Sequence, residues 1–184
     1  MPLMIGFTGL RGVGKSLAAD LLVNKFGFHK AHAFGPGKAM CVTYYEYLGI
    51  DHWTANRMVH GDLKDVPHDK LPNGVASRFF MEHFGKFMGV SMGPDWTLAV
   101  ELDKLQREGA KLITVESLVY EADVFRNKGG YIVRLERSGT KQTGEHTDIA
   151  QAKVREDALL DNNGSVEELE SKLAKLVEAL GERR

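Results

Sequence analysis

The octapeptide "GLRGVGKS", residues 9–16, constrains the fold of this chain more than any other feature. It follows a short apolar run, "LMIGFT", that has the length and composition of a buried strand. It leads directly into residues 15–26, where Leu17, Leu21 and Leu22 lie on one face of a helix. The sequence therefore predicts a strand, a glycine-rich turn and a helix in immediate succession.

The octapeptide matches the phosphate-binding pattern G-x-x-x-x-G-K-[ST]. Glycines allow positive φ angles, so that backbone N–H groups converge on phosphate oxygens beside the positive end of the helix. Lys15 is expected to reach the β- and γ-phosphates of a nucleoside triphosphate, and the Ser16 hydroxyl to ligate Mg²⁺. The predicted nucleotide-binding residues are Gly9, Arg11, Gly12, Val13, Gly14, Lys15, Ser16 and Leu17. ATP and Mg²⁺ are the expected cofactors.

Further apolar segments alternate with helical ones along the chain. "KLITVES" (residues 111–117) and "GGYIVRLER" (129–137) predict strands that end in a carboxylate and in a base. The alternation favours an α/β fold of three layers, with a mostly parallel central sheet covered by helices on both faces. Ligands of such sheets bind at the carboxyl ends of the strands, where Gly9, Glu116 and Arg137 fall.

Helices are predicted around these strands. The sequence "GPG" at residues 35–37 breaks the chain before a helical segment. Helical patterns cover residues 38–49, 74–90 and 94–109 and resume at about residue 148, whereas residues 51–72 indicate loops and a short helix. The last helix starts with a capping box of Ser165 and Glu168. Its leucine stripe is expected to pack on the sheet, with another subunit as the alternative partner.

Composition narrows the class of protein. The chain has 184 residues and a formal charge of −1, from 24 Lys and Arg against 25 Asp and Glu, so charge balance supports neither a nucleic-acid polymer nor a membrane surface as partner. A single cysteine, Cys41, excludes an internal disulfide framework and is expected to be a small buried residue. No window approaches the roughly 18 apolar residues of a membrane span. We expect one cytoplasmic domain over residues 1–184.

Magnesium also needs a carboxylate at the end of another strand, and Glu116 is the best placed candidate. Glu121 and Asp123 are alternatives. The N-K-x-D segment that a GTPase needs is missing, because "NKGG" at residues 127–130 lacks the aspartate. The pattern favours a small phosphotransferase that combines a phosphate-loop core, an acceptor-binding helical insertion and a basic lid.

The lid is predicted over residues 137–155. Its polar loop, residues 138–147, is flanked by bases: Arg134, Arg137 and Lys141 on one side, His146 and Arg155 on the other. Phosphoryl transfer needs positive charge on the migrating phosphoryl group and exclusion of water, and a flexible arginine-bearing loop supplies both. We therefore take Lys15, Arg137 and Arg134 as the candidate catalytic residues, with Arg137 the best placed arginine.

Several segments together resemble the deoxynucleoside monophosphate kinases of tailed bacteriophages, a family within the P-loop nucleoside monophosphate kinases. They are "GLRGVGKSLAADLL", "FGPGK", "GPDW", "LITVESLVYEADVFRNKGG", "VRLER" followed by "EHTD", and "NNGSVEEL". Val115 and Ser117 replace the aspartate and arginine that such kinases typically show, whereas Glu121 is retained.

The resemblance implies a P-loop kinase fold in which residues 36–95 bind the acceptor, a nucleoside monophosphate. It implies a host-cytoplasmic location if the chain is of phage origin, and it allows a homodimer. The substrate-binding candidates that it indicates are Lys38, Arg57, Lys64, Arg78, Lys86, Asp95, Trp96 and Glu121. A monophosphate dianion needs one or two of these bases, preferably a bidentate arginine.

Two alternatives stay open at this stage. The first is a kinase of dephospho-coenzyme A or another small molecule such as a sugar acid, since these enzymes share the same core. The second is a non-catalytic ATP-binding protein, because Val115, Ser117 and Val90 stand where the family carries polar residues. A panel of acceptors distinguishes the first alternative from a nucleoside monophosphate kinase. The second alternative predicts ATP binding without acceptor-dependent turnover.

Overall fold

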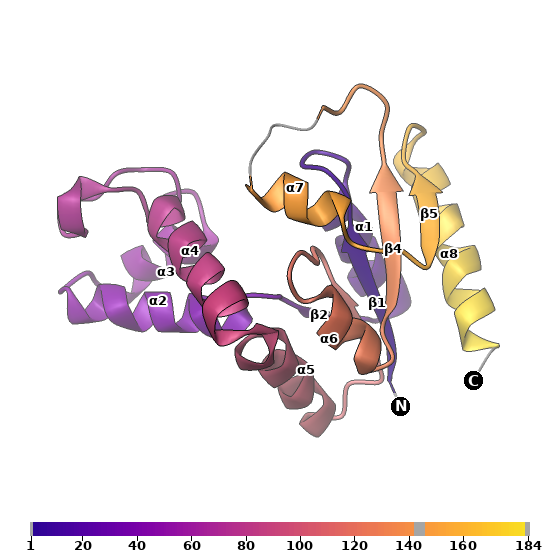
Figure 1. Cartoon of the computed structure of the whole chain (residues 1–184), viewed down its shortest axis with the longest axis horizontal. Helices are drawn as coiled ribbons and strands as arrows, with labels where there is room; N and C mark the ends of the chain where they lie inside the picture. The colour runs from indigo at the N-terminus through magenta and orange to yellow at the C-terminus, as the bar shows by residue number, and fades with distance from the viewer. Residues whose placement is uncertain (1, 142–145, 183–184) are drawn as a thin grey trace. The chain divides into compact units, whose positions relative to one another are not determined.

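Five parallel strands form one sheet in the computed structural model, which describes residues 2–141 and 146–182 (Figure 1). The strand order is β2-β3-β1-β4-β5. The strands are β1 (Leu3–Thr8), β2 (His29–Ala31), β3 (Leu112–Val115), β4 (Tyr131–Glu136) and β5 (Ala158–Asp161). The predicted α/β class is confirmed, and every strand pair in the described part of the chain is parallel.

The described helices follow the strands in sequence. The α-helices are α1 (Lys15–Phe26), α2 (Gly35–Tyr47), α3 (His52–His60), α4 (Ser77–Lys86), α5 (Leu98–Arg107), α6 (Ala122–Asn127), α7 (His146–Ala152) and α8 (Val166–Gly181). Three short helical turns complete them: η1 (Pro72–Gly74), η2 (Phe87–Met92, of the π type) and η3 (Pro94–Trp96). None of the helices in the described ranges is both long and apolar enough to cross a lipid bilayer.

Strand β1 is central because all six of its residues are buried. It pairs with β3 on one side, where Gly6 lies opposite Val115, and with β4 on the other, where Thr8 lies opposite Arg134. The strand order runs from β1 to β3 and β2 on one side and to β4 and β5 on the other, so the connections on the two sides of β1 run in opposite directions. Ligands of such sheets bind at the carboxyl end of the strand where the direction changes. The glycine-rich octapeptide starts one residue later.

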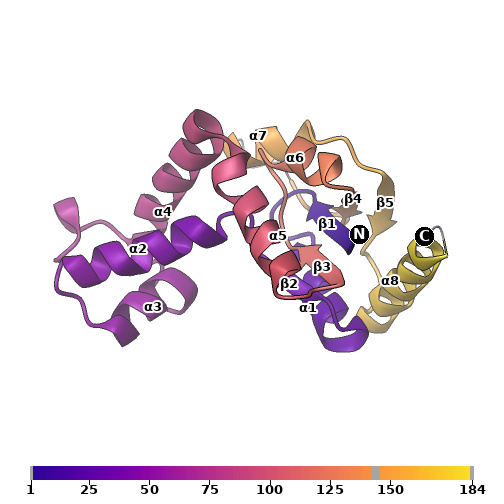
Figure 2. The ribbon, with the colours of Figure 1, turned by 90° about the horizontal axis from the view of Figure 1, so that it is seen from below.

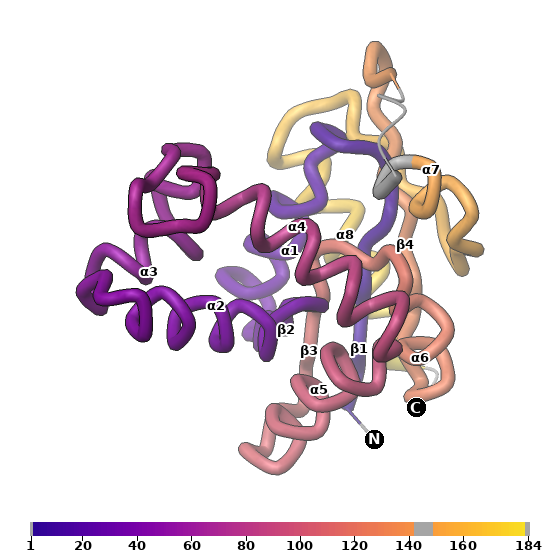
Figure 3. The backbone as a smooth tube through the Cα atoms, turned by 60° about the vertical axis from the view of Figure 1, so that its left-hand side comes forward, coloured from indigo at the N-terminus to yellow at the C-terminus, as the bar shows by residue number. Residues whose placement is uncertain are grey.

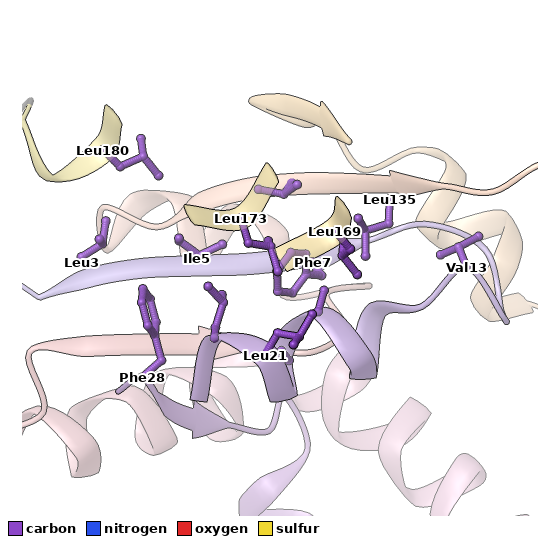
Figure 4. Packing of buried hydrophobic residues seen from close by; sticks show 14 residues of the cluster. Leu3, Ile5, Phe7, Val13, Leu21, Phe28, Leu135, Leu169, Leu173 and Leu180 are labelled. Atoms are coloured by element: carbon purple, nitrogen blue, oxygen red, sulfur yellow. The ribbon is translucent and has the colours of Figure 1, made fainter. Parts of the chain in front are cut away.

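One face of the sheet packs against α1 and α8 (Figure 4). Ile5 and Phe7 of β1 share a buried cluster with Leu21 of α1 and with Leu169 and Leu173 of α8. Alternate residues of a strand point to the same face, and apolar residues three or four apart point to the same side of a helix. The leucine stripe of the last helix therefore packs on the sheet, as the sequence predicts.

Helices α6 and α7 lie on the opposite side of the sheet from α1 and α8 (Figure 2). Glycine at position 6 allows the close approach on that face, because a Cβ atom there would lie 2.4 Å from Leu118 Cδ1 and 2.8 Å from Phe125 Cε1. Leu118 and Phe125 are both fully buried. The Lys128 ammonium at the end of α6 also bonds Asp103 of α5 at 2.7 Å.

The chain divides into two compact units, Phe34–Val100 and the remainder, Met1–Ala33 with Glu101–Arg184. The first unit contains α2, α3 and α4 (Figure 3) and has a core of its own. Tyr45 is buried at its centre and shares a 2.8 Å hydrogen bond with the Ser77 hydroxyl. Cys41 is fully buried, as predicted, and burial raises the pKa of its thiol to about 12. The predicted acceptor segment, residues 36–95, falls within this unit.

Helix α2, strand β5 and helix α6 differ from the sequence prediction. Helix α2 begins at Gly35 rather than Lys38, because a proline in the first helical turn needs no N–H partner and Pro36 occupies that place. Strand β5 and helix α6 are present although the sequence pattern did not indicate them. Of the predicted lid, residues 137–155, the stretch 142–145 lies outside the described residues and the rest includes α7.

Truncating the leucine stripe should destabilise the protein. Leu173→Ala removes a fully buried side chain from the sheet-facing side of α8, and we expect the free energy of unfolding to fall by about 2–5 kcal/mol. Urea denaturation followed by far-ultraviolet circular dichroism measures the change. Val166→Ala on the same helix is the matched control, since Val166 is 46% exposed. Equal losses in the two variants would contradict this packing.

Candidate functional site

The octapeptide forms a curled loop between β1 and α1. Gly9, Gly12 and Gly14 have φ angles of 129°, 85° and 99°, a region that side chains other than glycine rarely adopt. Helix α1 begins at Lys15 directly after the loop, so the free N–H groups of its first turn face the same end of the sheet. Loop and helix together have the backbone geometry that is typical of anion-binding sites.

Lys15 folds back over this loop. Its ammonium donates hydrogen bonds to the carbonyl oxygens of Gly9 at 2.6 Å and Leu10 at 2.9 Å. These bonds hold the positive charge of the side chain against the first residues of the loop. The flexible four-carbon stem lets the ammonium exchange carbonyl oxygens for the oxygens of a phosphate chain.

A cavity of about 340 Å³ opens beside the loop. Three segments line it: the loop residues Gly9, Leu10 and Val13, the end of β4 with the residues that follow it, and the turn between β5 and α8. Figure 3 shows these three connections at the same end of the sheet. The volume lies within the range of small-molecule sites. The end of β5 and the turn after it contribute Asp161 and Asn163, which the sequence pattern did not single out.

The two predicted lid arginines have different surroundings. The Arg134 side chain is only 15% exposed, and its guanidinium bonds Glu156 Oε2 at 3.0 Å and the carbonyl oxygens of Val154 and Gln151. It therefore ties the segment around α7 to β4. The hydrogen bond from Arg134 also lowers the pKa of Glu156.

Arg137 follows the end of β4 and, unlike Arg134, is exposed, and both arginines line the cavity. Its guanidinium makes no ion pair with a carboxylate among residues 2–141 and 146–182. The loop after it is held by a 2.6 Å hydrogen bond from the Thr140 hydroxyl to the Arg137 carbonyl oxygen. Lys141 is exposed, and the side chain of His146 lies outside the described residues.

Glu116, the predicted metal ligand, lies at the carboxyl end of β3. The chain beyond it continues beside β1, since the Leu118 amide donates to the Phe7 carbonyl oxygen at 2.8 Å. Glu116 thus lies at the same end of the sheet as the loop. Its carboxylate pairs with the Lys30 ammonium at 2.8 Å and lies 3.6 Å from His32 Nε2.

Lys30 in turn bridges Glu116 and Asp20 of α1, both at 2.8 Å. Burial by itself lowers the pKa of Lys30, but the hydrogen bonds to the two carboxylates outweigh it and the pKa is raised. In the described part of the chain, no three His, Cys, Asp or Glu side chains gather as a metal site. A magnesium ion here would take most of its ligands from phosphate and water, which is usual for Mg²⁺.

The two residues that replace the typical family residues, Val115 and Ser117, stand on either side of Glu116 in the sequence. Val115 is fully buried in β3, and the Ser117 hydroxyl accepts a 2.8 Å hydrogen bond from Gln151 of α7. Both side chains therefore have structural partners. Ser117 and Arg134 together attach α7 to the sheet.

Glu121 is a buried carboxylate, only 7% exposed, at the start of α6. It accepts a 3.1 Å hydrogen bond from the Val119 amide. Burial raises the pKa of Glu121, and its bonds to backbone amides only partly offset that effect. Asp123, the other alternative metal ligand, has a side chain that is 96% exposed and lies 4.0 Å from Arg126.

The acceptor candidates in Phe34–Val100 separate into groups. Lys38 and Lys64 approach the same imidazole: partial burial lowers the pKa of His60, and the positive charges of the two lysines lower it further. The Arg78 amide donates to the Lys64 carbonyl oxygen at 2.8 Å, and the Arg78 guanidinium pairs with both oxygens of Asp65. Lys38 and Lys64 therefore lie near one imidazole, whereas the charge of Arg78 is engaged by Asp65.

Arg57 has other partners. Its guanidinium bonds Asp62 at 2.8 and 2.6 Å and lies 4.5 Å above the Trp53 ring. The hydrogen bond from Arg57 lowers the pKa of Asp62 to about 2. The remaining candidates, Lys86, Asp95 and Trp96, are exposed. Trp96 is therefore not a core residue.

Two viral proteins are similar to this chain in sequence. No protein-family model matches the chain. A protein of Acanthamoeba polyphaga mimivirus with the provisional name deoxynucleotide monophosphate kinase is 24% identical, over 95% of this chain and 96% of its own. A deoxynucleotide monophosphate kinase of Escherichia phage RB69 is 34% identical over 140 residues, 72% of this chain. This chain spans 54% of that relative's length.

A solved structure supports the fold. Dephospho-CoA kinase from Campylobacter jejuni superposes with a TM-score of 0.50 at 14% identity, covering 97% of this chain and 96% of its own. The likeness extends to the arrangement of sheet and helices.

The buried carboxylate makes stability depend on pH. Because the folded-state pKa of Glu121 is raised, its contribution is most favourable below its ordinary pKa of 4.5 and is lost as pH rises through the folded-state value. Glu121→Gln keeps an acceptor for the Val119 amide without the charge. We expect this variant to gain stability relative to the wild type between pH 4.5 and pH 7, measured by urea denaturation at several pH values. Asp123→Asn is the exposed control, and a gain of the same size there would exclude burial as the cause.

Proposed function

We propose that this chain, a P-loop kinase homologous to the deoxynucleotide monophosphate kinases, is itself a nucleotide kinase that transfers the γ-phosphoryl group of ATP to a nucleoside or deoxynucleoside monophosphate. The observation that carries the proposal is the curled loop of residues 9–16 with Lys15 folded over it beside a cavity. The names of the two viral relatives indicate the class of acceptor.

The donor nucleotide would use the loop and the cavity together. Backbone amides of the loop and the Lys15 ammonium would hold the phosphate chain, and the cavity would take the nucleoside. Because the backbone amides are fixed before the substrate arrives, they stabilise the charge on the migrating phosphoryl group without reorganisation, whereas the Lys15 ammonium first exchanges the carbonyl oxygens of Gly9 and Leu10 for phosphate oxygens. An oxygen of the acceptor monophosphate would form the new P–O bond while the bond from the γ-phosphorus to ADP breaks. No protein nucleophile is required.

Magnesium would be held by the Ser16 hydroxyl and the Glu116 carboxylate, with phosphate oxygens and water completing its coordination. Bound there, the ion would neutralise negative charge on the β- and γ-phosphates. Lys30 holds the Glu116 carboxylate at the end of β3, although it must share the carboxylate with the metal.

The acceptor monophosphate would bind to the unit that contains α2, α3 and α4. Lys38 and Lys64 both approach His60, so they are better candidates for the phosphate dianion than Arg57 and Arg78, which Asp62 and Asp65 already engage. Lys86 remains a further candidate for the phosphate, Asp95 and Trp96 for the nucleoside side, and Glu121 a proposed substrate-binding residue. We further propose that residues 137–155 close over the phosphates as a lid, with Arg137 carrying the charge.

The first experiment measures ADP formation from ATP and Mg²⁺ with a panel of ribo- and deoxynucleoside monophosphates, plus dephospho-coenzyme A and a sugar acid. We expect stimulation by one or a few monophosphates and its loss in Lys15→Ala, because the ammonium cannot then reach the phosphates. Stimulation only by another acceptor would replace the proposed substrate class. ATP binding with no stimulation by any acceptor would reject the kinase proposal.

The two lid arginines should respond differently to the same substitution. Arg137→Gln should lower kcat by roughly a hundredfold with little change in melting temperature, because an exposed charge that faces the cavity is lost. Arg134→Gln should instead lower the free energy of unfolding by about 2 kcal/mol, since charged hydrogen bonds to α7 and its surroundings are removed. Steady-state kinetics measure kcat and urea denaturation measures the free energy of unfolding for both variants. A kcat unchanged in Arg137→Gln contradicts its role.

A further inference from the structure

The turn between β5 and α8 joins the two parts of the donor site through one buried side chain. Asn162 is only 6% exposed, and its carboxamide Nδ2 donates a 2.8 Å hydrogen bond to the carbonyl oxygen of Val13 in the phosphate loop. The acceptor fixes which end of the amide points there, since a carbonyl can only accept. The bond spans 149 residues of sequence.

The same carboxamide fits against the next residue of the loop. A Cβ atom at Gly14 would lie 2.3 Å from Asn162 Nδ2, so the glycine leaves the space that the amide fills. The Val13–Gly14 peptide, which directly precedes α1, is therefore held from one side by a specific donor. That peptide belongs to the part of the loop whose N–H groups would face the phosphates.

Two further bonds anchor the turn to the other wall of the cavity. The backbone N–H of Asn162 donates to the Glu136 carbonyl oxygen at 2.8 Å, and Asn163 Oδ1 accepts from the backbone N–H of Ser138 at 2.6 Å. Glu136, Ser138 and Asn163 all line the cavity that we assign to the donor nucleoside. The wall of the nucleoside cavity and the phosphate loop are thus connected through Asn162.

We infer that Asn162 is a positioning residue for the phosphate-binding loop: its buried side-chain carboxamide fixes the Val13–Gly14 peptide in the geometry that binds the triphosphate. The inference rests on the proposed donor site. Without the donor bond, the loop would sample other conformations and lose preorganised amides before each binding event. The affinity for the phosphates would fall, whereas the contacts to the base would not change.

The test compares the binding of Mg²⁺–ATP and of Mg²⁺–tripolyphosphate, which has no base, by isothermal titration calorimetry well below the melting temperature. Asn162→Ala should weaken both ligands by the same factor, about tenfold, as expected for one hydrogen bond. Asn163→Ala should weaken ATP more than tripolyphosphate, because Asn163 lines the nucleoside cavity. Asn24→Ala on the exposed side of α1 is the surface control. Asn162→Ser, whose hydroxyl is too short to reach Val13, provides a second variant if alanine prevents folding.

The outcomes are distinct. Both dissociation constants unchanged in a folded Asn162 variant, with only a lower melting temperature, would overturn the inference and leave Asn162 a purely structural residue. Weaker ATP binding with unchanged tripolyphosphate binding would overturn it too, because the base would then be the group affected. If the wild type binds Mg²⁺–ATP but phosphorylates no acceptor, the kinase proposal fails while these binding constants still decide the role of Asn162.

Discussion

The site depends on a stretch of backbone that must curl with positive φ angles at the end of a buried strand. Glycine makes the curl possible, but neighbours decide where it lies. A Cβ atom at Gly9 would lie 2.4 Å from the Leu135 carbonyl oxygen, and one at Gly14 would meet Asn162. The loop is therefore fitted between β4 and the turn after β5. Its geometry follows from the strand order as much as from its own sequence.

Elements with a strong local pattern could be predicted from the sequence. Strand β1 is a continuous apolar run because both of its faces are covered, and α8 shows a clear stripe because only one of its sides is buried. Strand β5 has no such pattern: it is a four-residue edge strand in which Leu159 is 56% exposed. Helix α6 spans six residues, fewer than two turns, so periodicity has too little length to show.

Residue types at the site could also be predicted, but their partners could not. Arg134 and Arg137 are three positions apart around the end of one strand, and in sequence they look equally suited to phosphate. The distinction comes from Glu156 and the carbonyl oxygens near α7, because these groups reach Arg134 only when the chain is folded. The same holds for Arg57 with Asp62 and for Asn162 with Val13. Contacts over long or irregular sequence distances leave no local periodicity.

Charge in the unit Phe34–Val100 is balanced locally, so a formal charge of −1 for the whole chain does not exclude a region that attracts anions. Arg78 pairs with Asp65, whereas partial burial and then the positive charges of Lys38 and Lys64 lower the pKa of His60. A phosphate dianion placed among these groups would oppose the effect of the lysines on the imidazole. It would therefore raise the pKa of His60 and favour uptake of a proton beside the anion, without a permanent excess of charge in the unit.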